Sequence, residues 1–379
     1  MKIVTIVGAR PQFIKAAAIQ RAIEAFNQNQ SRSKKQVQEV LVHTGQHYDY
    51  LMDEVFFKEL ELPKPNYHLG VGSGSHAKQT GLMLERIEVV LQKVKPDVVM
   101  IYGDTNSTLA GALAAAKLNI PVAHVEAGLR SYNRNMPEEI NRLLTDHLST
   151  LLFCPTTQSV KNLLKEGIKN GGKRIVKNVG DVMYDSILYY SKKAERRSTI
   201  LKNLGFDTKH EARVTSYYLA TLHRAENTDD PNKLKSIFVA LDEMGGKTPV
   251  IFPLHPRTKK MMKIYQLFSK FKNIKFIEPV SYIDMLQLEK NAKAILTDSG
   301  GVQKEAYWLK VPCFTLREET EWGEIVKNGW NVLVGTEMRK IVKKVRYMEG
   351  RRRVLKRHGL FGDGKASQKI IQILVKHFG

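Results

Sequence analysis

The chain has 379 residues, a length that favours two domains. Of these residues, 42% are hydrophobic and 26% are charged, a composition typical of a globular protein. No apolar run approaches the roughly 18 residues that span a bilayer, and the N-terminal run is too short for a signal sequence. The two cysteines, Cys154 and Cys313, fall in strand-like segments, so we expect reduced core thiols in a cytoplasmic protein, not a disulfide or a metal pair.

The formal net charge is +22, from 60 Lys and Arg against 38 Asp and Glu. Nucleic-acid binding is one explanation of such a charge. The basic residues, however, concentrate in "RKIVKKVRYMEGRRRVLKRHG" near the C-terminus, with no zinc-finger spacing or RNP-type motif beside them. We therefore expect solvated helix faces that attract an anionic substrate, and rank nucleic acid well below a small anion as the partner.

Short apolar runs alternate with amphipathic helical stretches from end to end. A first series of strands is expected at 2–8, 39–45, 97–103, 121–128 and 150–155, and a second at 216–223, 249–256, 292–301 and 311–316. Continuous apolar strands joined by helices predict parallel sheets that are covered on both faces.

The two series predict an α/β protein of two doubly wound Rossmann-like domains that face a central cleft. We place the first domain at residues 1–175 and the second at 176–362. We expect a terminal helix at 363–379, which could pack back on the first domain. Ligands of such sheets bind beyond the carboxyl ends of the strands, where the polar motifs of this chain lie.

The first strand-to-helix turn, "GARPQFIKAA", carries Arg10 and Lys15. Two cations beside a helix N-terminus could hold a pyrophosphate, although a solvated surface turn is the simpler alternative. The turn lacks the GxGxxG pattern, so no nicotinamide cofactor is indicated. After the second strand, Gln46 and His47 in "TGQHYD" suit sugar hydroxyls and an ordinary turn equally well.

Three carboxylates are candidates for acid and base chemistry. Asp104 follows one strand in "YGDTNST" and Glu126 follows the next in "HVEAGLRS". Two carboxylates in a poorly solvated site acquire different pKa values, which lets one act as acid and the other as base. Asp104 could instead be a helix N-cap. In "MPEEINRLLTDHLS", Glu138 and Arg142 lie four residues apart on one helix face and could simply pair.

In the second series, His223 in "TLHRAEN" and His255 in "FPLHPRT" end neighbouring strands. The stretch "LTDSGGVQKEA" predicts an anion site at the start of a helix, where small residues allow close backbone approach. Glu305 lies about one and a half helical turns beyond Ser299, too far along to oppose a phosphate, but suited to accept ribose hydroxyls. We interpret Asp298 as a structural cap on the turn.

These motifs together resemble the non-hydrolysing UDP-N-acetylglucosamine 2-epimerases. The resemblance runs from "GARPQFIKAA" through "GDTNST", "HVEAGLRS", "PEEINR", "HRAEN" and "LTDSGGVQKEA" to "LREETEW". It implies the glycosyltransferase-B architecture, a homodimer, a role in polysaccharide biosynthesis, and no cofactor or metal. The implied reaction interconverts UDP-GlcNAc and UDP-ManNAc by eliminating UDP to 2-acetamidoglucal and adding it back.

Motif position implies the residue roles. The expected catalytic residues are Asp104, Glu126, Glu138 and His223, with the assignment of acid and base left open. The expected substrate-binding residues are Arg10, Lys15, Arg142, His255, Ser299, Gly300, Gly301, Glu305 and Arg317.

The chain departs from many bacterial members at two places. Ala225 replaces the second Arg of "HRREN", and Lys78 precedes Gln79 where an Arg is common. In bacterial members this region binds a second UDP-GlcNAc as activator, for which Gln46, His47 and Gln79 are the candidates here. Two other activities on this fold stay open: a hydrolysing UDP-GlcNAc 2-epimerase, and a different glycosyltransferase.

Overall fold

The computed structural model describes residues 1–29, 36–46, 57–206, 216–349 and 359–379. The chain divides into two compact units. The first comprises Met1–Leu188 with Gly359–Gly379, and the second comprises Tyr189–His358. None of the described helices is long and apolar enough to cross a membrane.

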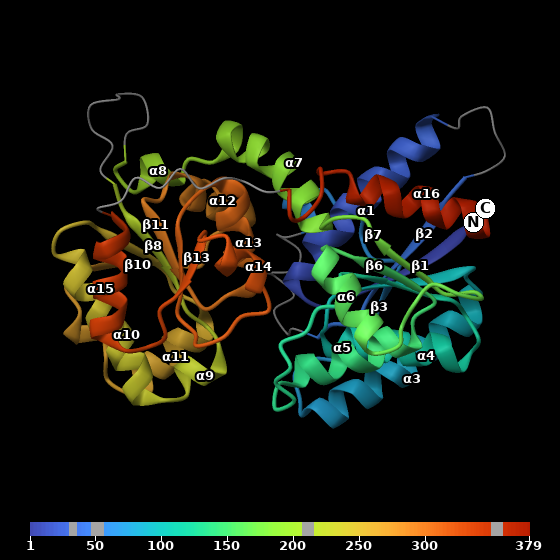
Figure 1. Ribbon diagram of the computed structural model, residues 1–379, viewed down its shortest axis with the longest axis horizontal. Coiled ribbons are helices and arrows are strands. Elements are labelled where there is room, and N and C mark those ends of the chain that lie inside the picture. The colour runs from blue at the N-terminus through green and yellow to red at the C-terminus, as the bar shows by residue number, and fades with distance from the viewer. Residues whose placement is uncertain (30–35, 47–56, 207–215, 350–358) are drawn as a thin grey trace. The chain divides into compact units, whose positions relative to one another are not determined.

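The first unit is built on a seven-stranded parallel sheet of order β3-β2-β1-β4-β5-β6-β7 (Figure 1). Its strands are β1 (Lys2–Val7), β2 (Gln38–His43), β3 (Tyr67–His68), β4 (Val98–Tyr102), β5 (Val122–Val125), β6 (Leu151–Cys154) and β7 (Ile175–Asn178). Its helices are α1 (Arg10–Asn29), α3 (His76–Val94), α4 (Asn106–Lys117), α5 (Pro137–Leu148), α6 (Thr157–Lys165), the start of α7 (Val182–Arg197) and α16 (Ala366–Phe378).

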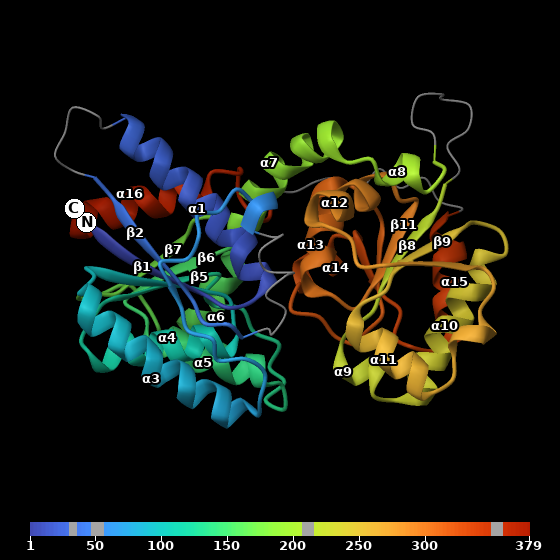
Figure 2. The ribbon, with the colours of Figure 1, turned by 180° about the vertical axis from the view of Figure 1, so that it is seen from behind.

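Side chains from both faces of this sheet are buried, as continuous apolar strands require. Val4, Ile6, Val42 and Val99 pack against α3 and the alanine-rich α4. Figure 2 shows α1 and α16 together on the opposite face. The N-terminus of α16 is held by Asp185, whose carboxylate accepts the N–H and the hydroxyl of Ser367 at 2.7 and 2.6 Å.

The second unit is built on a six-stranded parallel sheet of order β10-β9-β8-β11-β12-β13. Its strands are β8 (Tyr218–Thr221), β9 (Val250–Pro253), β10 (Ile274–Ile277), β11 (Ala294–Thr297), β12 (Cys313–Thr315) and β13 (Asn331–Leu333). Its helices are α8 (Ile200–Asn203), α9 (Ala225–Thr228), α10 (Pro231–Gly245), α11 (Pro256–Ile264), η1 (Phe268–Lys270), α12 (Tyr282–Asn291), α13 (Gly300–Leu309), α14 (Gly323–Lys327) and α15 (Met338–Glu349).

Both sheets contain the strand order of the Rossmann fold, in which the order reverses beside the first strand of the unit. The predicted α/β class with two doubly wound Rossmann-like domains is therefore confirmed. The reversal falls between β1 and β4 in the first unit, and between β8 and β11 in the second. Because adjacent helices leave these strand pairs on opposite sides of the sheet, each pair opens a crevice at its carboxyl edge.

Candidate active site

In the first unit, the turn after β1 is held tightly against the end of β4. A Cβ atom on Gly8 would lie 2.1 Å from the Thr44 hydroxyl oxygen, so only glycine fits there. The buried side chain of Gln12 accepts the N–H of Gly8 at 2.7 Å and donates to the carbonyl of Tyr102 at 2.8 Å. Gln12, which the sequence interpretation passed over, therefore ties the two loops of the crevice together.

Lys15 and Glu126 meet in this crevice. Their side chains form an ion pair, with exposed fractions of only 7% and 9%. Glu126 has a φ of 75°, a left-handed conformation that is uncommon for a residue with a side chain. Its carboxylate is thus held at a fixed place beside a buried ammonium group.

Asp104 pairs with Arg142 of α5, with 2.5 Å between its carboxylate oxygen and the guanidinium nitrogen. It does not cap α4, because Thr105 is the N-cap and forms a reciprocal capping box with Thr108. Burial raises the pKa of Asp104, the charges of Glu126 and Glu138 raise it further, and Arg142 and Lys15 oppose them. Glu126 and Glu138 therefore both lie within electrostatic reach of Asp104.

Glu139 is a buried carboxylate that the sequence interpretation missed. It is 1% exposed and accepts both Nε and Nη2 of Arg142, at 2.9 and 2.7 Å. It also accepts the backbone N–H groups of Ser131 and Tyr132, at 2.9 Å each. Glu139 thus holds the guanidinium that pairs with Asp104. Its other contacts come from the loop that carries Ser131 and Tyr132, and the sequence interpretation had paired Arg142 with the adjacent Glu138 instead.

Two of the three activator candidates are described. The side-chain oxygen of Gln46 accepts from the Ser107 hydroxyl at 2.6 Å. Gln79 donates to the carbonyl of Gly72 at 2.8 Å and accepts from Asn106 at 2.8 Å. Both amides therefore contribute to the wall of the crevice. His47 lies outside the described residues.

In the second unit, His223 follows β8 and Ser299 follows β11, so the order reversal brings these two predicted residues to adjacent strand ends. The Ser299 hydroxyl caps α13 by accepting the N–H of Val302 at 3.4 Å. The rings of His223 and His255 lie 5.1 Å apart. His255 is itself the N-cap of α11.

Asp298 differs from its predicted role as a cap on its own turn. Its fully buried carboxylate accepts the backbone N–H groups of His223 and Arg224, at 3.1 and 2.9 Å, and the side-chain amide of Asn227 at 3.1 Å. It therefore fixes the turn after β8, where the histidine lies.

The remaining predicted residues of this unit surround the start of α13. Gly300 and Gly301 form its first turn, and Glu305 is buried further along the helix. Arg317 is also buried, and its guanidinium donates to Glu226 at 3.0 Å and to Glu321 at 3.1 Å. Arg317 thus braces the segment that runs past the N-terminus of α13.

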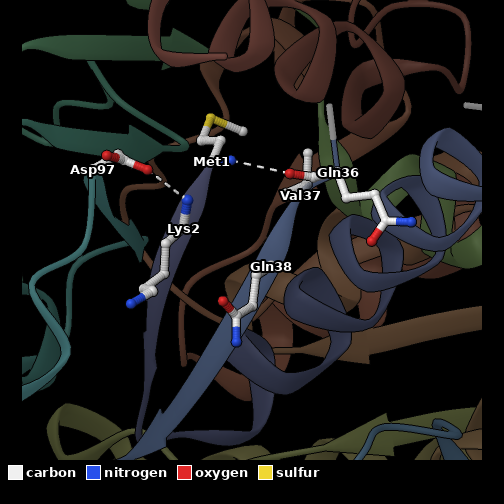
Figure 3. Close-up of a pocket in the computed structure, with 6 residues that line it drawn as sticks. All are labelled: Met1, Lys2, Gln36, Val37, Gln38 and Asp97. Atoms are coloured by element: carbon white, nitrogen blue, oxygen red, sulfur yellow. Dashed lines mark hydrogen bonds between the residues drawn. The ribbon is translucent and has the colours of Figure 1, made fainter. Parts of the chain in front are cut away.

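A hollow of about 580 Å³ lies at the amino edge of the first sheet, lined by Met1, Lys2, Gln36, Val37, Gln38 and Asp97 (Figure 3). It is at the opposite end of the strands from the carboxylates, and its two interactions hold the strand starts together. Among the described residues, no group of three His, Cys, Asp or Glu side chains is placed to hold a metal ion. The candidate site lies at the carboxyl edges, where the predicted carboxylates and the start of α13 are.

Known proteins resemble this chain in both sequence and fold. A family model described as UDP-N-acetylglucosamine 2-epimerase matches residues 29–375. The chain is 53% identical over 378 residues to the UDP-N-acetylglucosamine 2-epimerase homolog of Methanococcus maripaludis, with 99% of each chain covered. It is 48% identical over 378 residues to the UDP-2,3-diacetamido-2,3-dideoxy-D-glucuronate 2-epimerase of Pseudomonas aeruginosa, covering 99% of this chain and 100% of the relative.

A crystal structure of the Methanocaldococcus jannaschii UDP-GlcNAc 2-epimerase, in complex with UDP-GlcNAc and UDP, matches the fold with a TM-score of 0.88 at 48% identity. The match covers 99% of this chain and 100% of that one. The extent of the family match, the identity and the shared fold agree with the resemblance in the motifs. The chain belongs to the UDP-N-acetylglucosamine 2-epimerase family.

Proposed function

We propose that the protein interconverts UDP-N-acetylglucosamine and UDP-N-acetylmannosamine without hydrolysing either. A base removes the C2 proton while the bond between C1 and the UDP oxygen breaks, which gives 2-acetamidoglucal and UDP. UDP then adds back at C1 while C2 receives a proton on the opposite face. The reaction needs an acid and a base near C2 and a firm grip on the leaving diphosphate.

The cluster of acids in the first unit carries this proposal. The charges of Glu126 and Glu138 both act on Asp104, and the pKa of Asp104 is raised, with burial as the largest cause. Groups whose environments push their pKa values apart are suited to opposite roles in proton transfer. Lys15 and Arg142 hold two of the carboxylates in place and supply positive charge for the sugar and the leaving group. We place Arg10 at the diphosphate and His223 among the proton-transfer groups.

The start of α13 supports a UDP site in the second unit. The free N–H groups of Gly300 and Gly301 suit a phosphate, because a helix N-terminus favours an anion. Ser299 and His255 flank the phosphates in this proposal, and Glu305 accepts the ribose hydroxyls. Arg317, which pairs with Glu226 and Glu321, keeps the neighbouring segment in place.

Incubation with UDP-GlcNAc in D₂O tests the proposal. We expect both UDP-sugars to carry deuterium at C2, with no net loss of nucleotide sugar. Stoichiometric release of free N-acetylmannosamine would instead identify a hydrolysing epimerase. Transfer of the sugar to an added acceptor without C2 exchange would identify a glycosyltransferase.

The comparison with a Pseudomonas aeruginosa relative suggests an alternative substrate. The Pseudomonas relative, named for a UDP-diacetamido-dideoxyglucuronate, is 48% identical to this chain over nearly its whole length. That sugar has the same C2 acetamido group and UDP, but adds a second acetamido group at C3 and a carboxylate at C6. The ratio of kcat/KM for the two UDP-sugars decides between them, and we expect UDP-GlcNAc to give the larger value.

We also propose a cofactor-independent homodimer that supplies a precursor for polysaccharide biosynthesis. Light scattering coupled to size-exclusion chromatography measures the mass in solution. Turnover after exhaustive treatment with a chelator, compared with turnover before it, tests the independence from metals.

A further inference from the structure

A buried histidine connects the two turns that carry Asp104 and Glu126. His124 lies on β5 and is 0% exposed. Its Nε2 is 2.7 Å from the carbonyl oxygen of Gly103, directly before Asp104. Its Nδ1 is 2.8 Å from a carboxylate oxygen of Asp146 on α5. A carbonyl only accepts a hydrogen bond, so Nε2 is a donor to the Asp104 turn.

Asp146 extends the connection to the Glu126 turn. Its second oxygen accepts the N–H of Gly128 at 3.1 Å and Nη1 of Arg130 at 2.7 Å. Burial alone would raise the pKa of Asp146, but the bonds and charges of His124 and Arg130 outweigh burial and lower it. Asp146 is therefore an ionised acceptor that joins His124 to the Glu126 turn.

The Glu126 turn needs such support because its backbone is in the left-handed region at Glu126 and again at Gly128, with φ values of 75° and 80°. Such conformations persist where the surroundings determine them. Arg130 donates through both Nε and Nη2 to Glu166, at 2.7 and 2.6 Å, which secures the far side of the turn.

We propose that His124 and Asp146 are positioning residues that set the distance between the carboxylates of Asp104 and Glu126. This inference rests on the proposed C2 epimerisation, in which those carboxylates act on the same carbon. Both residues are fully buried, so they do not touch the sugar. A buried ionic network contributes little net stability compared with apolar packing. We therefore explain the network by its effect on the positions of the two turns and not by its effect on stability.

Two substitutions of His124 separate its two bonds. Asn places an amide N–H near the position of Nδ1, so His124→Asn keeps the link to Asp146 and loses the link to Gly103. Gln reaches the position of Nε2, so His124→Gln keeps the link to Gly103 and loses the link to Asp146. Ser149→Ala is the matched control, because Ser149 is buried and its hydroxyl donates only within the last turn of α5, to the carbonyl of Thr145.

We expect each His124 variant to lower kcat about 10- to 100-fold with KM changed less than about threefold, because small displacements of reacting groups are costly. Ser149→Ala should keep the wild-type kcat, even where its melting temperature falls as far as that of the His124 variants. Wild-type kcat in both His124 variants, or an equal loss of kcat in Ser149→Ala, overturns the inference.

Hydrogen exchange measures the two turns without relying on turnover. We expect His124→Asn to speed exchange in peptides that contain Gly103 and Asp104, and His124→Gln to speed it in peptides that contain Gly128 and Arg130. Unchanged protection of both turns in both variants overturns the inference. Wild-type protein that leaves UDP-GlcNAc unchanged in D₂O refutes the proposed function instead, while the exchange result still decides whether His124 connects the turns.

Discussion

The carboxylate of Asp298 accepts the backbone N–H of His223 at 3.1 Å, although 75 residues separate them in the chain. Asp298→Asn keeps the shape but replaces one acceptor oxygen with a donor amide in a fully buried place. We expect the free energy of unfolding to fall by about 2–4 kcal/mol, since a buried donor then loses its partner. Turnover should fall as well, because the turn that carries His223 loosens.

Denaturant unfolding and kcat of the same variant test this expectation. Asp242→Asn is the control: it removes the same charge from the same unit, where Asp242 accepts the Asn273 N–H near the surface. An Asp298 variant as stable and active as the control contradicts the prediction.

The ion pair between Lys15 and Glu126 is almost fully buried, so breaking it from one side leaves an uncompensated charge. Lys15→Met and Glu126→Gln should each cost about 3–5 kcal/mol of stability, and the double variant less than their sum. A double-mutant cycle by denaturant unfolding measures the coupling energy. The same cycle on the exposed pair Lys259 and Glu278 should give under about 1 kcal/mol; equal coupling in both cycles would rule out a special role for burial.

Glu139→Gln tests whether a fixed Arg142 matters for Asp104. The Gln oxygen can accept only part of what the carboxylate accepts, so we expect kcat to fall about 10-fold or more. Burial acts to raise the pKa of Glu139, but the bonds from Ser131, Arg142 and Tyr132 lower it overall.

A lowered pKa means that Glu139 stabilises the fold above its unfolded pKa of about 4.3, and that this stability is lost as pH falls through the folded pKa. Unfolding free energies of wild type and Glu139→Gln should therefore converge on acidification. Glu88→Gln, on an exposed part of α3, is the comparison variant. A constant difference at all pH values contradicts the assignment.

The pKa of Glu39 on β2 is shifted in the opposite direction from that of Glu139, so its effect on stability has the opposite pH dependence. Burial raises its pKa to about 7, although the Thr5 hydroxyl donates to it. Between about pH 4.3 and 7 the unfolded chain releases this proton while the folded protein keeps it, so stability falls as pH rises through this window. Glu39→Gln should remove the fall and be more stable than wild type at pH 8 by about 1–3 kcal/mol. Thermal unfolding of wild type and Glu39→Gln from pH 4 to 8 measures this difference in stability. A difference that stays constant over this range would contradict the raised pKa of Glu39.

Gly128 combines a positive φ with a crowded site, where a Cβ atom would lie 2.4 Å from the carbonyl oxygen of Ser159. Gly167 has a similar φ of 76° with nothing within 4 Å. Gly167→Ala should therefore cost only about 1–2 kcal/mol, the penalty of the left-handed backbone. Gly128→Ala should cost clearly more in the same unfolding assay, and an equal cost would mean that helix α6, which carries Ser159, shifts without penalty.

The apolar interior strands of both sheets could be predicted from the sequence, because each is a continuous buried run. The strands that were missed lie at the sheet edges and are short or partly polar: β3 has two residues, β13 has three, β7 reads "IVKN" and β10 reads "IKFI". Edge strands bury fewer side chains, so their sequences contain less of the apolar signal.

The position of a candidate residue in the fold could be predicted where a motif places it just after a strand, as for Asp104, Glu126 and Ser299; their roles stay predictions. Residues that act through partners distant in sequence were not found. Glu139 and Asp146 look like helix surface residues in "PEEINRLLTDHL", and only the fold brings Ser131 to Glu139 and Arg130 and His124 to Asp146. The target of the Asp298 carboxylate was missed for the same reason.

The anchoring of α16 beside α1 has a consequence for biogenesis. During translation, the sheet of the first unit emerges from the ribosome long before the helix that covers one of its faces. Until Ser367 reaches Asp185, apolar surface on α1 stays open to water, and the whole second unit has time to fold in the interval. Apolar surface of the first unit therefore stays exposed on the nascent chain until α16 has emerged from the ribosome and docked.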